Sequence, residues 1–225
     1  MKSELPAVTV VMTTYFPTLR RRQVAERTLR SWQHYLKYQG ELRLHVADDG
    51  SDVTFFAAQY WQGAITYSYQ RRYGVGASLN QGFRQGFSVS PLVLYAVDDW
   101  ALTFPLDITP WAEVLLSRSE VGMVRLGPPH PNIRGEVRVY SEDWRSWGLC
   151  LERYAYAFGH RPALYHQRMI DTYGWFEEDV TALECEKVYA ERFARMTGPD
   201  IVLSLSSPWF HMPEESLSAV VPEED

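Results

Sequence analysis

The sequence has few cysteines and no long apolar run. Its 225 residues include two cysteines, Cys150 and Cys185, which lie far apart and outside any Cys-x-x-Cys pattern. This arrangement excludes a cysteine zinc site and a disulfide framework, and it suits a reducing compartment. The N-terminus carries no apolar stretch of the signal-peptide type, and there is no run of about 18 apolar residues. We therefore expect a cytoplasmic protein without a membrane span.

Positive charge is also scarce. The sequence holds 22 Lys and Arg against 28 Asp and Glu, which gives a formal net charge of −6. That balance argues against a protein that wraps nucleic acid electrostatically. Five arginines nevertheless gather in one segment, and a solvated helix face is the favoured interpretation over a basic patch; they are Arg20, Arg21, Arg22, Arg27 and Arg30.

Apolar runs alternate with helical patterns along the first half of the chain. Residues 7–13 and 92–97 are apolar or β-branched, which predicts strands buried on both faces. Further strands are predicted at 42–47, 65–69 and 121–126, and helices at 20–38, 54–61, 78–86, 111–117 and 184–196. This alternation predicts an α/β fold with a mostly parallel, doubly wound sheet flanked by helices.

The second half of the chain is less regular. Residues 128–150 are rich in Pro, Gly, Trp and charge, and we expect a loop or mobile flap there. Residues 213–225 form an acidic tail. We expect one domain over 1–225, with a regular half at 1–100 and an irregular half at 101–212.

Polar side chains follow three of the predicted strands where each strand ends. These clusters are Thr13-Thr14-Tyr15, Asp48-Asp49 and Asp98-Asp99. In doubly wound sheets, ligands bind at the carboxyl ends of the strands. The clusters therefore predict a binding site at that edge of the sheet.

The adjacent carboxylates Asp98 and Asp99 have two interpretations. Two buried carboxylates are costly without a partner, and a divalent cation would resolve their repulsion. Mg²⁺ or Mn²⁺ takes one or two carboxylates together with phosphate oxygens. The alternative is an N-cap for a following helix. From this pair alone, both interpretations stay open.

Two glycine-containing segments are weak signals on their own. Asp48-Asp49-Gly50-Ser51 is typical of an ordinary turn, although a carboxylate there could also accept from a base or a ribose hydroxyl. Residues 74–82 (GVGASLNQG) precede and enter a helix but lack the GK[ST] ending of a phosphate-binding P-loop.

Taken in order, four segments resemble the family 2 glycosyltransferases, which have the GT-A fold. The segments are 8–17 (VTVVMTTYFP), 45–52 (HVADDGSD), 71–86 (RRYGVGASLNQGFRQG) and 94–100 (LYAVDDW). The resemblance covers about 100 residues, and it rests on the ordered set rather than on any single motif. It implies that 1–100 is a nucleotide-sugar binding half and that 101–212 carries the acceptor site and the catalytic base.

The resemblance implies roles for the residues that contact the nucleotide. Thr14 and Tyr15 would line its pocket, and Asp49 would contact the base. Arg71 would approach the base or a phosphate, and Asp98 would face the ribose or sugar.

The resemblance also implies a site for Mn²⁺ or Mg²⁺. Asp99 would be the principal metal ligand, and His211 would complete the metal shell. Many members carry an Asp-x-Asp motif. In this sequence Trp100 replaces the second carboxylate of that motif. A partly buried histidine beside aromatic residues is the alternative interpretation of His211.

The candidate catalytic base lies in the second half. The family pairs a Gly-x-Phe-Asp/Glu segment with a later acidic pair on a helix, followed by an arginine; 174–178 (GWFEE) and 184–192 match this pattern. Glu186 is the best candidate, because an acceptor hydroxyl must lose its proton as it attacks. Glu184 and Asp179 are its rivals, and all three could be solvated helix carboxylates.

We therefore predict a metal-dependent glycosyltransferase that transfers a sugar from a nucleotide-diphosphate sugar to an acceptor hydroxyl with inversion. The alternatives are a GT-A-like nucleotide-binding module without activity and, ranked lower, a sugar nucleotidyltransferase, which usually has a glycine-rich loop after its first strand. The acceptor is not defined by the sequence; a small molecule, a glycan, a protein and a modified DNA base all stay open.

Overall fold

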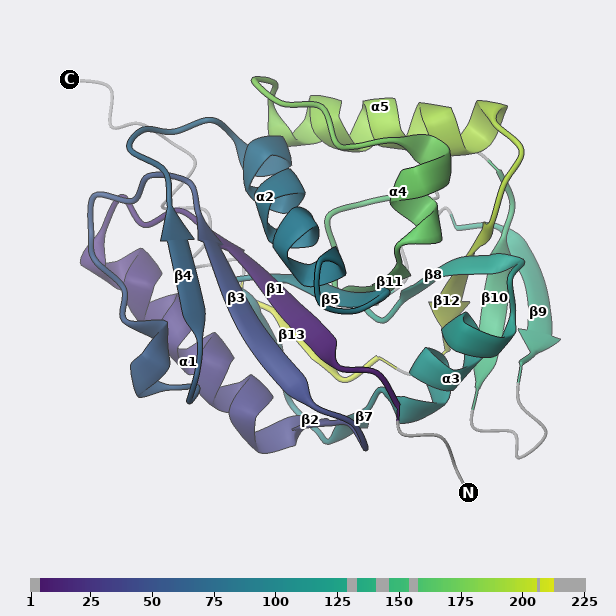
Figure 1. The fold of residues 1–225 in the computed structure, drawn as a ribbon, viewed down its shortest axis with the longest axis horizontal. Coiled ribbons are helices and arrows are strands. Elements are labelled where there is room, and N and C mark those ends of the chain that lie inside the picture. Colours follow the sequence, from purple (N-terminus) through teal and green to yellow (C-terminus); the bar gives the residue numbers. More distant parts are fainter. Residues whose placement is uncertain (1–4, 129–132, 141–145, 154–157, 206, 213–225) are drawn as a thin grey trace.

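The computed structural model describes residues 5–128, 133–140, 146–153, 158–205 and 207–212. A nine-stranded sheet runs through the molecule (Figure 1). Its strands, in spatial order, are β4 (Ile65–Ser68), β3 (Leu42–Asp48), β1 (Val8–Thr14), β5 (Leu92–Val97), β11 (Ala163–His166), β8 (Val121–Arg125), β12 (Asp200–Ser204), β10 (Trp147–Leu151) and β9 (Gly135–Val139). Both halves of the chain therefore contribute to one sheet.

Most strands of this sheet point the same way. β1 pairs in parallel with β3 and β5, and β3 pairs in parallel with β4. β11 is antiparallel to both β5 and β8, so β5 and β8 share a direction, and β12 is parallel to β8. Only β11 and β10 oppose the others among the nine strands of this sheet. The predicted mixed α/β fold with a mostly parallel sheet is confirmed.

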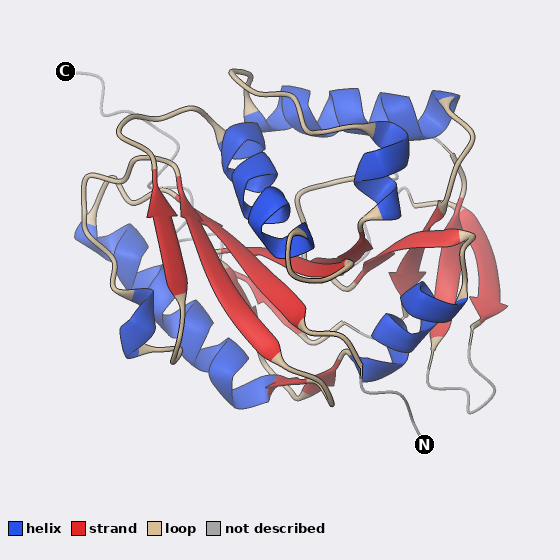
Figure 2. Ribbon diagram, viewed as in Figure 1, coloured by secondary structure: helices blue, strands red, loops and turns tan. Residues whose placement is uncertain are grey.

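Helices cover both faces of the sheet (Figure 2). On one face lie α1 (Leu19–Tyr35) and α3 (Thr109–Ser117), and on the other lie α2 (Val75–Phe87), α4 (Arg168–Tyr173) and α5 (Ala182–Arg195). The two layers follow from the alternation of side chains along β1. Val10 packs with Trp32 of α1, whereas Val11 packs with Phe83 of α2.

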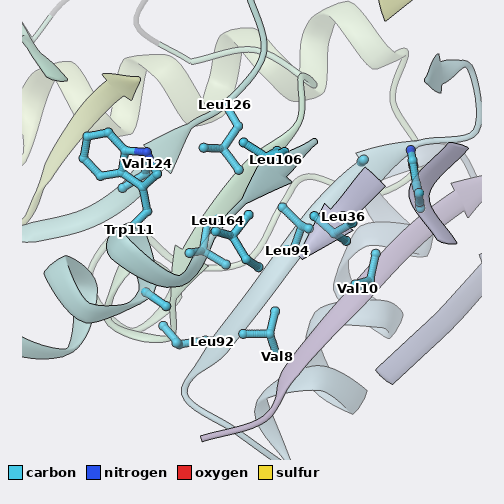
Figure 3. Close-up of a cluster of buried hydrophobic side chains, with 14 of the residues drawn as sticks. Val8, Val10, Leu36, Leu92, Leu94, Leu106, Trp111, Val124, Leu126 and Leu164 are labelled. Atoms are coloured by element: carbon cyan, nitrogen blue, oxygen red, sulfur yellow. The ribbon is translucent and has the colours of Figure 1, made fainter. Parts of the chain in front are cut away.

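Figure 3 shows the core on the α1 and α3 face. It joins Val8 and Val10 of β1 to Leu94 of β5, Leu164 of β11 and Trp111 of α3, all of them buried. Burial of apolar area on both sides of the sheet holds the ends of β1, β3 and β5 in place.

Two glycines shape α2: Gly74 allows the turn from which the helix begins, and Gly82 allows the helix to lie close to the sheet. Gly74 precedes α2 with φ of 89°, a conformation that side chains rarely adopt. Gly82 lies against β1, where a Cβ would come within 2.4 Å of Cγ1 of Val11. The glycine-containing segment therefore serves close packing of a helix on the strand that ends at the predicted site.

Two small sheets lie beside the main one. β6 (Trp100–Leu102) pairs with β13 (Trp209–His211), and β2 (Leu36–Lys37) pairs with β7 (Leu106–Asp107). The predicted helix at 20–38 ends at Tyr35, because Leu36 and Lys37 enter β2. The first of these pairings brings the end of the described chain next to Asp98 and Asp99.

Other sequence predictions were wrong in detail. The predicted helix at 54–61 is reduced to the 3₁₀ turn η1 (Ala57–Gln59). The loop or flap predicted at 128–150 contains strands β9 and β10, which form the edge of the sheet, so its charged residues alternate on an exposed strand. The predicted acidic tail at 213–225 lies outside the described residues.

Two further findings concern the cysteines and the helices. Cys150 and Cys185 are both free and buried. Within the described parts of the chain, no helix is both long enough and apolar enough to cross a membrane.

Candidate active site

A cavity of about 320 Å³ lies at the carboxyl ends of β1, β3 and β5. Of the residues predicted to bind a nucleotide-sugar and a metal, five line it: Thr14, Tyr15, Asp49, Asp98 and Asp99. Arg21, Arg72 and Ala182 line it as well. Arg71, Glu184, Glu186 and His211 are not among its lining residues. The strand ends therefore do converge on one cavity, as their sequence positions predict.

The acidic pair, Asp98 and Asp99, is held by an arginine that faces it from α1. Nη2 of Arg21 donates to Oδ1 of Asp98 and lies 3.0 Å from Oδ2 of Asp99. All three side chains are buried, with 8% or less of each exposed. The repulsion between the two carboxylates is thus reduced within the protein itself. The helix-cap interpretation is wrong, because strand β6 follows the pair directly.

Arg21 reaches the pair because of its place on α1. Thr18 caps the helix, and its hydroxyl accepts from the backbone N–H of Arg21. Arg21 shares the buried face of α1 with Val24, Thr28 and Trp32, which follow at helical spacing. The arginine segment is therefore not a uniform solvated face. The sequence signal for this contact is that a charged residue, Arg21, falls at helical spacing from the apolar residues of the buried face.

The pKa values of the two carboxyls of the acidic pair are shifted in opposite directions. Burial raises the pKa of Asp98 well above its ordinary value, although the charge of Arg21 opposes the change. Burial also acts to raise the pKa of Asp99, but the hydrogen bond from His211 and the charge of Arg21 outweigh it and lower that pKa. Asp99 is therefore the more firmly ionised of the two.

His211 approaches Asp99 from β13. Its Nε2 lies 3.4 Å from Oδ2 of Asp99, and the backbone N–H of Met212 donates to the carbonyl of Asp99 at 3.1 Å. The imidazole lies on the ring of Trp100, with 4.9 Å between centroids. The carbonyl of Trp100 accepts from Trp32 Nε1 at 2.7 Å. This hydrogen bond anchors β6, and the histidine's strand β13 pairs with β6.

The acidic pair fits a cation that completes its shell with ligand oxygens. Oδ2 of Asp98 and Oδ1 of Asp99 are buried and have no hydrogen-bond partner. Arg21 supplies one positive charge to two carboxylates, so a net negative charge remains. In the described residues, no group of three or more His, Cys, Asp and Glu side chains is arranged to hold a metal. Mg²⁺ and Mn²⁺ sites commonly draw their other ligands from phosphates and water.

The carboxylates at the end of β3, Asp48 and Asp49, organise the neighbouring loops. Asp48 accepts from the Thr14 hydroxyl at 2.9 Å and from the backbone N–H of Ser51 at 3.1 Å. Asp49 accepts from the backbone N–H groups of Tyr73 and Gly74 at 2.7 and 2.9 Å. Burial raises the pKa of Asp49 against these hydrogen bonds. Asp49 therefore borders the cavity and also holds the loop before α2.

The two arginines of that loop lie differently. Arg72 lines the cavity, with its guanidinium 4.4 Å from the ring centroid of Tyr15 and its Nε 3.7 Å from Asp49 Oδ2. Arg71 instead lies over the ring of Tyr73 at 4.8 Å. Of these two adjacent residues only Arg72 lines the cavity, and the sequence does not show which of the two does so.

The candidate bases lie on and before α5. Oε1 of Glu186, which is half-buried, accepts from the backbone N–H of His160 at 2.6 Å. Glu184 is exposed and forms a capping box with Thr181, in which each side chain bonds the other's backbone N–H. Asp179 has φ of 57° in the turn before the helix. Of these carboxylates, only Glu186 is drawn into the interior.

The start of α5 borders the same region as the acidic pair. Ala182, its first residue, lines the cavity. The phenol of Tyr95 is fully buried below, and burial raises its pKa, with further contributions from the charges of Glu186 and Asp99. Asn80 of α2 holds the segment before α5, because its side chain exchanges hydrogen bonds with the backbone of Phe176 at 2.9 Å.

This arrangement of sheet and helices confirms the predicted GT-A fold. S. aureus TarS has a similar structure. Its 1–349 fragment in complex with UDP-GlcNAc superposes on 90% of this chain and 57% of its own, with a TM-score of 0.62 and 14% identity.

Two further TarS structures agree. The 1–349 fragment alone covers 94% of this chain and 62% of its own, with a TM-score of 0.62 and 14% identity. The longer TarS chain covers 94% of this chain and 38% of its own, with a TM-score of 0.60 and 14% identity. This chain thus spans less than two thirds of those proteins. In comparisons by sequence, no family model and no curated protein matches the chain.

Proposed function

We propose that this protein is a metal-dependent glycosyltransferase that moves a sugar from a nucleotide-diphosphate sugar to an acceptor hydroxyl with inversion. The observation that carries the proposal is the acidic pair in the cavity, with an unpartnered oxygen on each carboxylate. The fold supports it, since TarS was crystallised in complex with UDP-GlcNAc and with UDP. UDP-GlcNAc is therefore the first donor to test.

The donor would bind along the strand ends. Thr14, Tyr15 and Asp49 would border the nucleoside, and Arg72 would approach its phosphates, a position that the sequence assigned to Arg71. Asp98 would face the ribose or sugar. Each of these residues comes from a strand end or from the loop that Asp49 holds, so the pocket would be preformed.

Asp99 and His211 would hold Mn²⁺ or Mg²⁺, with Asp98 beside them. When bound, the cation neutralises the negative charge that develops on the leaving diphosphate. The protein's own part would be to keep Asp99 ionised, which its lowered pKa favours. Arg21 offsets part of the negative charge.

Glu186 would act as the general base, taking the proton of the acceptor hydroxyl as it attacks the anomeric carbon. Its half-buried position favours it over Glu184, whose carboxylate caps the start of α5. Direct displacement from the face opposite the leaving diphosphate gives inversion. The acceptor is a small molecule, a glycan, a protein or a modified DNA base.

Two observations favour a second candidate, a nucleotide-binding module without turnover. Oε1 of Glu186 is occupied by the His160 backbone N–H, and Arg21 already occupies the acidic pair. In that case the cavity would bind a nucleotide, but no sugar would be transferred.

The deciding experiment measures release of UDP from UDP-GlcNAc, and from other nucleotide-sugars, with Mn²⁺ present. We expect Asp99→Ala to lower the rate by about a hundredfold or more, as for loss of a main electrostatic stabiliser. Glu184→Gln is the matched control, since it also removes a carboxylate but leaves the cavity intact. Full activity of Asp99→Ala would overturn the metal assignment. Calorimetric nucleotide binding without turnover of any donor would favour the binding module.

A further inference from the structure

Arg21 lies where a cation would otherwise be needed. Its Nη2 contacts both carboxylates of the acidic pair, whereas its Nη1 is buried without a hydrogen-bond partner. The guanidinium also lines the cavity. Three buried polar atoms are thus left unsatisfied at one place: a donor on Arg21 and an acceptor on each of Asp98 and Asp99. Unsatisfied buried groups are costly, so a ligand that pairs with all three atoms would be favoured at this place.

The unsatisfied atoms match a ligand that carries both signs of charge. The free carboxylate oxygens suit a cation, and the free N–H of a guanidinium suits a phosphate oxygen. A cation entering alone would meet the positive charge of Arg21 on the same two carboxylates. A diphosphate entering alone would meet the remaining negative charge of the pair. Each ligand therefore needs the other to enter the cavity.

We propose that Arg21 couples cation binding to diphosphate binding: it holds the acidic pair when the cavity is empty and turns its hydrogen bonds to phosphate oxygens when both ligands are bound. Arg21 is then a ligand-binding residue that opposes the cation alone and favours the cation with a diphosphate. This inference rests on the proposed function, because it takes the acidic pair as the cation site.

The test measures two affinities for the full chain. The first is for Mn²⁺ alone, followed through the electron paramagnetic resonance signal of the free ion. The second is for inorganic pyrophosphate at excess Mn²⁺, by calorimetry, with the protein-free Mn²⁺–pyrophosphate association subtracted. Pyrophosphate is the probe because it carries no base or sugar, so the result does not depend on the identity of the donor.

Arg21→Gln should change the two affinities in opposite directions. We expect Mn²⁺ alone to bind about tenfold more tightly, because no positive charge competes for the carboxylates, and pyrophosphate about tenfold more weakly, because its partner is gone. Loss of structure alone would weaken both. Arg20→Gln is the matched control, since Arg20 is the exposed neighbour on α1 and does not line the cavity. Its affinities should equal those of the wild type.

Arg21→Lys keeps the proposal testable if Arg21→Gln does not fold. The ammonium preserves the charge, so Mn²⁺ alone should bind within about threefold of wild type. Pyrophosphate should bind about tenfold more weakly, because a single ammonium cannot replace a guanidinium fork. Any variant of Arg21 that leaves pyrophosphate affinity unchanged, or an Arg21→Gln protein that binds Mn²⁺ no more tightly, overturns the inference.

The outcome separates this inference from the proposed function. Both expected shifts without any sugar transfer would support the coupling and contradict the glycosyltransferase activity. Sugar transfer that depends on Asp99, together with unchanged affinities in the Arg21 variants, would support the activity and overturn the coupling.

Discussion

Two groups of carboxylates flank the candidate site, and the protein treats them differently. The acidic pair at the end of β5 is buried and is matched by a buried guanidinium. The α5 carboxylates, Glu184 and Glu186, satisfy themselves with backbone N–H groups. A fully buried pair of charges requires a charged partner, whereas a more accessible carboxylate can be satisfied by a backbone N–H: His160 for the half-buried Glu186 and Thr181 for the exposed Glu184. The comparison separates carboxylates that are paired with a buried cationic side chain from carboxylates that are paired with backbone N–H groups.

Removing Glu186 tests whether an α5 carboxylate does chemistry at all. We expect Glu186→Gln to lower the rate of UDP release from UDP-GlcNAc by about 10²- to 10⁴-fold, because a general base contributes that much. Nucleotide binding, measured by calorimetry, should stay within about threefold of wild type, because Glu186 does not line the cavity. A rate near that of wild type would show that neither Glu184 nor Glu186 is needed for the chemistry and that both serve the structure of α5.

Removing Arg21 tests how much the acidic pair depends on its partner. In EDTA at about pH 8, Arg21→Gln should unfold more easily by about 3–5 kcal/mol, because two buried carboxylates lose their counter-charge. Denaturant titration measures the free energy of unfolding. Arg20→Gln should lose less than about 0.5 kcal/mol, as for an exposed surface residue.

The pH dependence of that loss has a defined sign. Burial raises the pKa of Asp98 in the folded protein, and loss of Arg21 removes the charge that opposes this rise. A carboxyl with a raised folded-state pKa is stabilised in its protonated form, so the loss should shrink as the pH falls from about 8 to about 5. A loss that grows on acidification would show that the acidic pair is not the cause.

The smallest effect is expected at Glu184. Glu184→Gln weakens a capping box on the surface and should reduce the free energy of unfolding by about 1 kcal/mol or less. UDP release should be unchanged, because the side chain is exposed and does not line the cavity. A large loss of activity here would exchange the roles of the two α5 carboxylates.

The first half of the fold could be predicted because its signals are local. Apolar runs at β1 and β5 end directly at Thr13–Thr14 and Asp98–Asp99, and parallel strands bring such ends to one edge. The second half could not be predicted in the same way. β9 is an exposed edge strand with a charged alternation, and its pairing with β10 depends on contacts that the local sequence does not specify.

The side-chain contacts within the site were harder to predict from the sequence than the positions of its carboxylates. The contact of Arg21 with Asp98 spans 77 residues, and the choice between Arg71 and Arg72 depends on the loop that Asp49 holds. The motif identifies the carboxylates, whereas tertiary packing decides what neutralises them. The phase of Arg21 on α1 was visible in the sequence, but only knowledge of which face is buried gives it meaning.

The pairing of β13 with β6 has a consequence for how the protein is made on the ribosome. Arg21, Asp98 and Asp99 are all synthesised early, so the internal ion pair can form while much of the chain is still to be translated. His211 emerges far later, and only then can it approach Asp99. Domains often begin to fold during synthesis. The nascent protein would therefore carry an acidic pair partly offset by Arg21 before it carries the proposed cation site, which would delay cation binding until β13 is in place.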